Sequence, residues 1–76
     1  MEGVTRVGLS GGVEVGIYKL EEIFEEVRKL GIDDSKALKE ELFKRVKRNN
    51  WIPEDRDEEF AKAIFDAYKN FCRENE

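Results

Sequence analysis

Residues 37–53, ALKEELFKRVKRNNWIP, decide the fold of this chain. Leu38, Leu42 and Val46 are spaced four residues apart, which places them on one face of a helix. Acidic residues and a serine just before this stretch are good N-cap residues. We therefore predict a helix over residues 34–50 that packs its apolar face on the rest of the protein. Its expected buried residues are Ala37, Leu38, Leu42, Phe43 and Val46.

The C-terminal end of the same stretch combines cations, amides and an aromatic residue. Its cations lie where positive charge complements the negative end of the helix dipole. Asn49 and Asn50 are poor helix formers, and Pro53 biases Ile52 towards an extended conformation. We therefore expect the helix to end near Asn50. Trp51 follows directly, and it is either a core residue or an exposed anchor.

Two further helices flank this one in the sequence. Residues 19–30 carry apolar side chains at three- and four-residue intervals, and Gly31 suits the left-handed position that ends a helix. Residues 55–73 carry a second, broader apolar stripe, and its breadth indicates burial against two neighbours. Asp55, with a glutamate three residues later, resembles a capping box at the start of this helix, and Asp57 is an alternative cap.

The first 18 residues differ from the rest in composition, since they hold five of the six glycines. Apolar residues alternate on either side of a break at residues 10–12, which is the pattern of a glycine-turned β-hairpin. A flexible arm and a strand that pairs with a partner chain are the other interpretations of residues 1–18. A lone two-stranded hairpin is only marginally stable, so one face should pack on the helices. That face comprises Val7, Leu9, Val13, Val15 and Ile17.

Together these elements predict a mainly α protein, with three helices and a short N-terminal hairpin in a single domain over residues 1–76. The fold is α+β if the hairpin is ordered. A chain of 76 residues has room for one core, and 42% charged residues suit helices with solvated faces. No apolar run approaches the about 18 residues of a membrane span, and the N-terminus lacks the pattern of a signal peptide. We therefore expect a cytoplasmic protein without membrane contact.

The composition gives little support to catalytic or metal-binding chemistry. The chain has no histidine and one cysteine, Cys72, so it lacks a cluster of soft ligands for zinc or an iron–sulfur centre. The carboxylates of the first and third helices lack the spaced loop of an EF-hand. We expect no catalytic residue, no metal and no cofactor, and hence a protein that is not an enzyme.

Residues 8–12, GLSGG, match the GxSxG pattern of the hydrolase nucleophile elbow. An elbow needs a general base for the serine proton and a helix directly after the last glycine. The chain has no histidine, and VEVGIY follows the glycines, so a simple turn is expected. Backbone amides of such a turn can bind an anion or nucleotide. The candidate residues for that site are Ser10, Gly11 and Gly12.

The longer segment VGLSGGVE, residues 7–14, resembles the phosphate-binding loop of the PP-loop ATP pyrophosphatase family. In that family a strand ends in a glycine-rich SGG that is followed by an aspartate and a serine. The resemblance implies ATP use within an α/β domain. Glu14 and Val15 stand where the family has the aspartate and the serine, and the chain is much shorter than such a domain.

Residues 43–51, FKRVKRNNW, combine cations, amides and an aromatic ring that suit phosphates, base edges and a stacked base. Residues 33–50 carry six basic and four acidic groups, whereas residues 51–76 carry four and eight. The net charge of -4 disfavours a polyanionic partner. Trp and Arg are also enriched at protein interfaces, so a protein partner suits the same residues. The candidate contact residues are Lys44, Arg45, Lys47, Arg48, Asn50 and Trp51.

We therefore expect a small non-enzymatic interaction or adaptor module that binds protein, either another chain or a second copy of itself. Nucleic-acid binding through the basic end of the second predicted helix with Trp51 is the alternative. Anion or nucleotide binding at residues 10–12 is a weaker one. The side on which Trp51 lies decides whether it is a core residue or part of a binding surface.

Overall fold

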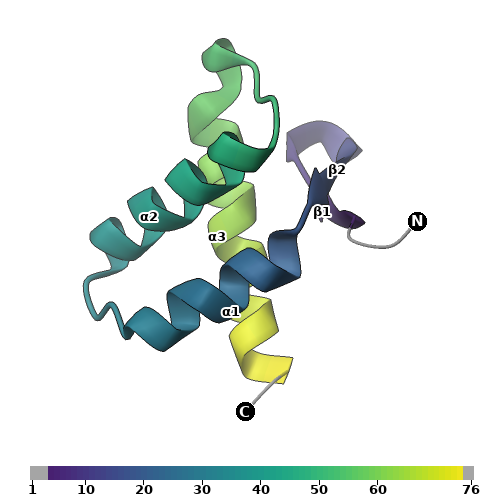
Figure 1. Cartoon of the computed structure of the whole chain (residues 1–76). Coiled ribbons are helices and arrows are strands. Elements are labelled where there is room, and N and C mark those ends of the chain that lie inside the picture. The colour runs from purple at the N-terminus through teal and green to yellow at the C-terminus, as the bar shows by residue number, and fades with distance from the viewer. Residues whose placement is uncertain (1–3, 75–76) are drawn as a thin grey trace.

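The three predicted helices and the N-terminal hairpin are all present, which confirms a mainly helical fold (Figure 1). The computed structural model describes residues 4–74, apart from the side chain of Ser10. The hairpin lies beside α1 and α3, and α2 packs across both of these helices. In chain order the elements are β1 (Val4–Gly8), a 3₁₀ turn (Ser10–Gly12), β2 (Glu14–Tyr18), α1 (Leu20–Leu30), α2 (Ser35–Asn49), a second 3₁₀ turn (Glu54–Arg56) and α3 (Asp57–Glu74).

β1 and β2 form a two-stranded antiparallel sheet, so residues 4–18 are a hairpin and not a flexible arm. Residues 1–3 of the expected arm lie outside the described part of the chain. Gly11 and Gly12 have φ values of 79° and 82°, in the left-handed region that glycine adopts with little strain. The two glycines therefore allow the tight turn between the strands.

One face of the hairpin packs on the helices, as the alternating pattern predicts. Val7, Leu9 and Ile17 are buried, and Val15 is half-buried. Val13 is an exception, because 47% of its surface is exposed. It directly follows the turn, where Gly11 and Gly12 are exposed as well. The prediction that Val13 is buried was therefore wrong.

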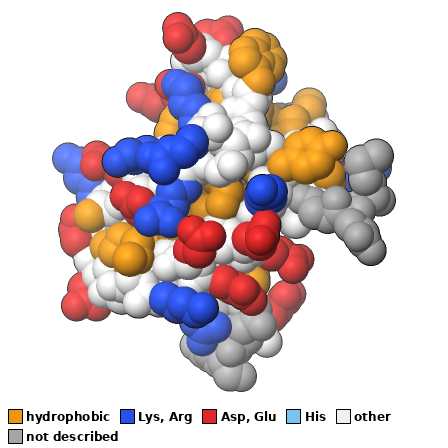
Figure 2. All heavy atoms as spheres, in the orientation of Figure 1, with side chains coloured by type: hydrophobic (Ala, Val, Ile, Leu, Met, Phe, Trp, Pro, Cys, Tyr) orange, Lys and Arg blue, Asp and Glu red, His pale blue; other side chains and the backbone are white. Residues whose placement is uncertain are grey.

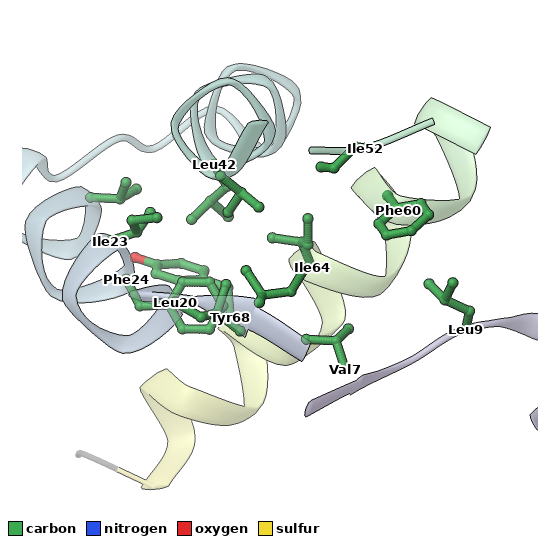
Figure 3. Close-up of a cluster of buried hydrophobic side chains, with 13 residues drawn as sticks. Val7, Leu9, Leu20, Ile23, Phe24, Leu42, Ile52, Phe60, Ile64 and Tyr68 are labelled. Atoms are coloured by element: carbon green, nitrogen blue, oxygen red, sulfur yellow. The ribbon is translucent and has the colours of Figure 1, made fainter. Parts of the chain in front are cut away.

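The core is one cluster of apolar side chains drawn from the hairpin, the three helices and the α2–α3 connection (Figure 3). The ring of Phe24 in α1 meets that of Tyr68 in α3 edge to face, with 5.3 Å between the ring centroids. Ala37 was expected in this cluster but is exposed. It precedes Leu42 by five residues, about 140° around the helix, and so faces solvent. The most deeply buried side chains are Leu20, Val27, Leu42, Val46 and Ile64.

The ends of the helices follow local capping rules. Gly31 ends α1 with a φ of 65° and donates its N–H to the Arg28 carbonyl. The Asp34 carboxylate accepts the Ala37 N–H at 3.0 Å, so α2 begins at Ser35. None of the helices within residues 4–74 has the length and apolar character that crossing a membrane requires.

α3 begins at Asp57, two residues after its predicted start. Asp55 lies instead in the second 3₁₀ turn, where the Arg56 N–H donates to the Pro53 carbonyl at 3.1 Å. The φ of -60° at Pro53 sets up this turn before the helix proper. The acidic residues at positions 57–59 then lie in the first turn of α3, where they complement its dipole.

Tyr68 makes the stability of this core dependent on pH. Burial, together with a hydrogen bond to Cys72, raises the pKa of Tyr68 from 10.0 to about 12. When the pKa of an acid is higher in the folded state than in the unfolded state, its neutral form stabilises the fold at any pH below the unfolded pKa. This contribution is lost as the pH rises through the folded pKa. We therefore expect the free energy of unfolding to fall between about pH 10 and pH 12.

Absorbance titration of the phenolate should accordingly show one tyrosine that ionises near pH 12. The Tyr68→Phe variant should lose this transition, whereas Tyr18→Phe, which changes an exposed ring, should keep it. A late transition that survives in Tyr68→Phe would contradict the assignment.

Candidate interaction groove

Trp51 is a surface residue, with 85% of its surface exposed. The next residue, Ile52, is only 3% exposed and joins the core near Phe60 and Ile64 (Figure 3). Pro53 is half-buried. The indole therefore stands on a short segment that the core holds in place, and Trp51 is not a core residue.

A groove of about 540 Å³ separates β2 from the connection between α2 and α3. Residues 15–18 of β2 form one side, and residues 49–51 with Pro53 form the other. Arg56 is the single charged residue among its lining residues. Figure 2 shows hydrophobic side chains, in orange, standing out on the hairpin side of the molecule. The groove thus offers mainly apolar side chains and amides.

The side chain of Asn50 closes one end of this groove. Its Oδ1 accepts the Tyr18 N–H at 2.8 Å, and its Nδ2 donates to the Tyr18 carbonyl at 3.2 Å. The same Nδ2 donates to the Val46 carbonyl at 3.1 Å. Asn50 therefore joins the end of β2 to the end of α2, and its amide is fully engaged within the protein. Both hydrogens of its Nδ2 are used in these contacts, so the side chain helps to position the groove.

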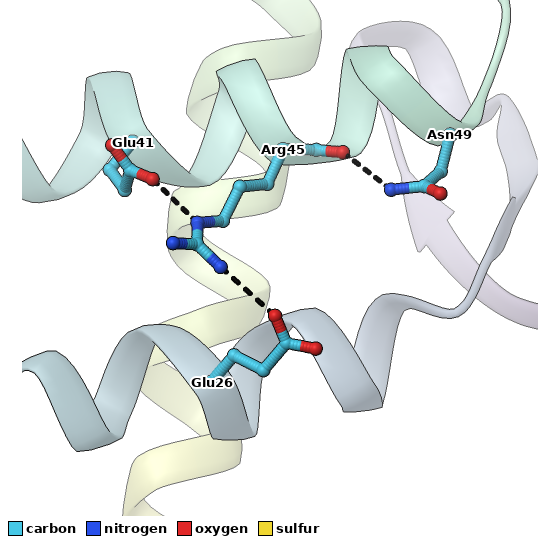
Figure 4. Close-up of polar contacts among 4 residues, drawn as sticks. All are labelled: Glu26, Glu41, Arg45 and Asn49. Carbon is cyan, nitrogen blue, oxygen red and sulfur yellow. Dashed lines mark hydrogen bonds and ion pairs between the residues drawn. The ribbon is translucent and has the colours of Figure 1, made fainter.

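Arg45, a predicted contact residue, is committed to internal ion pairs (Figure 4). Its Nε donates to the Glu41 carboxylate one turn earlier in α2, and its terminal nitrogen lies 3.0 Å from Glu26 Oε1 in α1. The hydrogen bond from Arg45 lowers the pKa of Glu41, which keeps the pair ionised. Arg45 thus fastens α2 to α1.

Lys47 is also engaged, since its Nζ lies 3.4 Å from Asp57 Oδ2 and 5.7 Å from the ring centroid of Phe43. Lys44 and Arg48 are exposed and form no ion pair with the described residues. Figure 2 shows cations over α2 with carboxylates among them. The basic run therefore offers less free positive charge than its sequence indicates.

The glycine turn does not contribute Gly11 or Gly12 to the lining of the groove. It joins two antiparallel strands, whereas a nucleophile elbow requires a strand followed by a helix. The α/β domain that the PP-loop resemblance implies is not formed by residues 4–74. Among the described residues, no three Cys, Asp or Glu side chains come together in a cluster suited to a metal ion. The side chain of Ser10 lies outside the described part.

No protein-family model, curated protein or solved structure matches the chain. Function must therefore be inferred from the geometry of the groove and its surroundings.

The sequence patterns did not indicate that several residues would shape a groove, namely Gly16, Tyr18, Pro53 and Arg56. A larger residue at position 16 would be obstructed, because a Cβ there would lie 2.8 Å from Val4 Cγ1. Tyr18 occupies an outward position of β2, which strand alternation alone could have revealed. Arg56 lies in the second 3₁₀ turn, and its contribution depends on how that turn is placed against β2, for which there is no local signal.

The role of Asn50 can be tested against its neighbour in the sequence. Asn50→Ala removes three hydrogen bonds, and we expect it to lower the free energy of unfolding by about 1–3 kcal/mol. Asn49→Ala is the matched control, since the Asn49 side chain makes one bond, to the Arg45 carbonyl at 2.9 Å. Amide exchange at Tyr18, measured by NMR, should accelerate in Asn50→Ala and not in Asn49→Ala. Equal acceleration in both variants would argue against the role of the Asn50 side chain in holding Tyr18.

Proposed function

We propose that this protein is a non-enzymatic interaction module whose contact surface is the groove beside Trp51. The observation that carries the proposal is the exposure of the Trp51 indole, which has 85% of its surface exposed. Its neighbours in the sequence are Asn50, whose side chain is hydrogen-bonded to Tyr18, and the buried Ile52. Trp is among the residues that contribute most to binding at protein interfaces. An aromatic side chain held on an ordered segment also loses little conformational entropy when it binds.

The surroundings of Trp51 support a protein partner. Tyr18 lines the same groove with 51% of its surface exposed, and a single arginine supplies the charge. Few charges and exposed aromatic rings are typical of the centre of a protein interface. Asn50 and the core order both sides of the groove, so binding need not order them first.

Nucleic-acid binding is the second candidate, because Lys44, Arg48 and the exposed Trp51 all lie towards the end of α2. Phosphate contact with this surface would have to work against the net charge of -4. Of the four cations in residues 44–48, two are already paired with carboxylates, namely Arg45 and Lys47, which leaves fewer for phosphate contacts. The protein-interaction proposal therefore has the better physical support.

Selection of short peptides from a random displayed library tests the groove without a known partner. We expect selected peptides to bind Trp51→Ala at least about tenfold more weakly than the unmodified protein, as at interface hot spots. Leu30→Ala is the matched control, because Leu30 is an exposed apolar residue, at 53%, that does not line the groove. Peptides that bind both variants equally, or a failure to select any, would count against the proposal.

Titration with single- and double-stranded oligonucleotides distinguishes nucleic-acid binding from the protein-interaction proposal. Affinity that falls steeply as salt rises, and that is lost in Lys44→Ala and Arg48→Ala, would favour nucleic acid. We expect no measurable binding at low salt.

A further inference from the structure

The outer edge of β2 is a short, open template for another strand. Tyr18 directs its N–H and carbonyl away from β1, because both are bonded to the Asn50 side chain. Bonding directions alternate along an antiparallel strand, so the backbone groups of Gly16 and Glu14 also point outwards. β2 pairs only with β1 among the described residues. The open edge therefore extends over residues 14–16, and Asn50 blocks it beyond that point.

This edge is complementary to itself. If two β2 strands run antiparallel with Val15 opposite Val15, Glu14 of each copy lies opposite Gly16 of the other. The outward N–H and carbonyl groups of each such pair then face one another and can exchange bonds in both directions. Gly16 has no side chain that would obstruct Glu14 of the second copy. Pairing would stop at Tyr18, whose backbone groups are already used.

The same register accounts for the exposed apolar residues. Val13, Tyr18 and Trp51 are three of the four large hydrophobic residues that the described chain exposes, and all three adjoin β2 or its groove. The antiparallel arrangement brings the hairpin tip of one copy, including Val13, beside Tyr18 and Trp51 of the other. The tip is slender, because Gly11 and Gly12 lack side chains. Each copy thus covers apolar surface on the other.

Charge does not oppose this arrangement as strongly as the net charge suggests. Glu14 lies 3.7 Å from Arg6 on the neighbouring strand, so the one acidic residue in the paired segment has a cation beside it. Arg56, which lines the groove, places a further positive group near the approaching copy.

We propose that two copies of this chain associate through their β2 edges about a two-fold axis, giving a four-stranded sheet in the order β1–β2–β2–β1. This inference rests on the proposed function, because it names the occupant of the groove. The paired segment is short and the interface is correspondingly small. We expect a weak, concentration-dependent dimer with a Kd on the order of 100 µM.

Sedimentation equilibrium and NMR dilution from about 1 mM to about 10 µM test the dimer across that Kd. The unmodified protein should dimerise at the higher concentrations, and the amide resonances of Glu14 and Gly16 should shift on dilution. Val13→Glu should stay monomeric throughout, because it places a charge at the contact. Leu30→Glu, an equally exposed change elsewhere, should dimerise like the unmodified protein. Circular dichroism checks that both variants are folded.

A chain that is monomeric at about 1 mM, or a dimer that Val13→Glu and Leu30→Glu affect equally, would overturn the second-copy proposal. In the unmodified protein, amide shift changes on dilution that are confined to residues away from β2 would also overturn it. If the chain is monomeric but displayed peptides bind through Trp51, the interaction function stands with another partner. If the β2 dimer forms but no peptide binds, self-association stands and the wider role in binding other proteins fails.

Discussion

The side-chain amide of Asn50 connects the two parts of this protein. A two-stranded hairpin has little stability of its own, and it is held here by core contacts and by the Asn50 bonds to Tyr18. The same amide satisfies the Val46 carbonyl near the end of α2. One residue thus caps a helix, anchors a strand and limits the length of the open edge.

The backbone beyond Asn50 explains how one short segment both fills the core and builds the surface. Asn50 is extended, with φ of -141°, and the proline at position 53 biases Ile52 towards an extended conformation as well. Successive side chains of an extended segment point in opposite directions. Because Ile52 is buried against α2 and α3, Trp51 is directed into solvent. The exposure of the indole is therefore tied to the packing of its neighbour.

Two ion pairs in this protein connect neighbouring helices. Arg45 links α2 to α1 through Glu26, and Lys47 links α2 to the start of α3 through Asp57. Such partly exposed pairs each contribute little to stability. They nevertheless remove two cations from a run that resembled a phosphate-binding surface. What remains beside the groove is mostly apolar, with Arg56 as the single charged residue among its lining residues.

The sequence by itself determined the elements of this fold, because their signals act over a few residues. Apolar spacing marked the helices, Gly31 marked the end of α1, residues 33–35 offered three N-caps for α2, and the glycines marked the hairpin turn. Those signals did not indicate which of Trp51 and Ile52 faces inwards. Only the tertiary structure decided this. It also decided the Asn50–Tyr18 hydrogen bonds, between residues 32 apart in the sequence, and the Arg45–Glu26 pair, between residues 19 apart. Such contacts depend on how distant elements pack, and no local pattern records that packing.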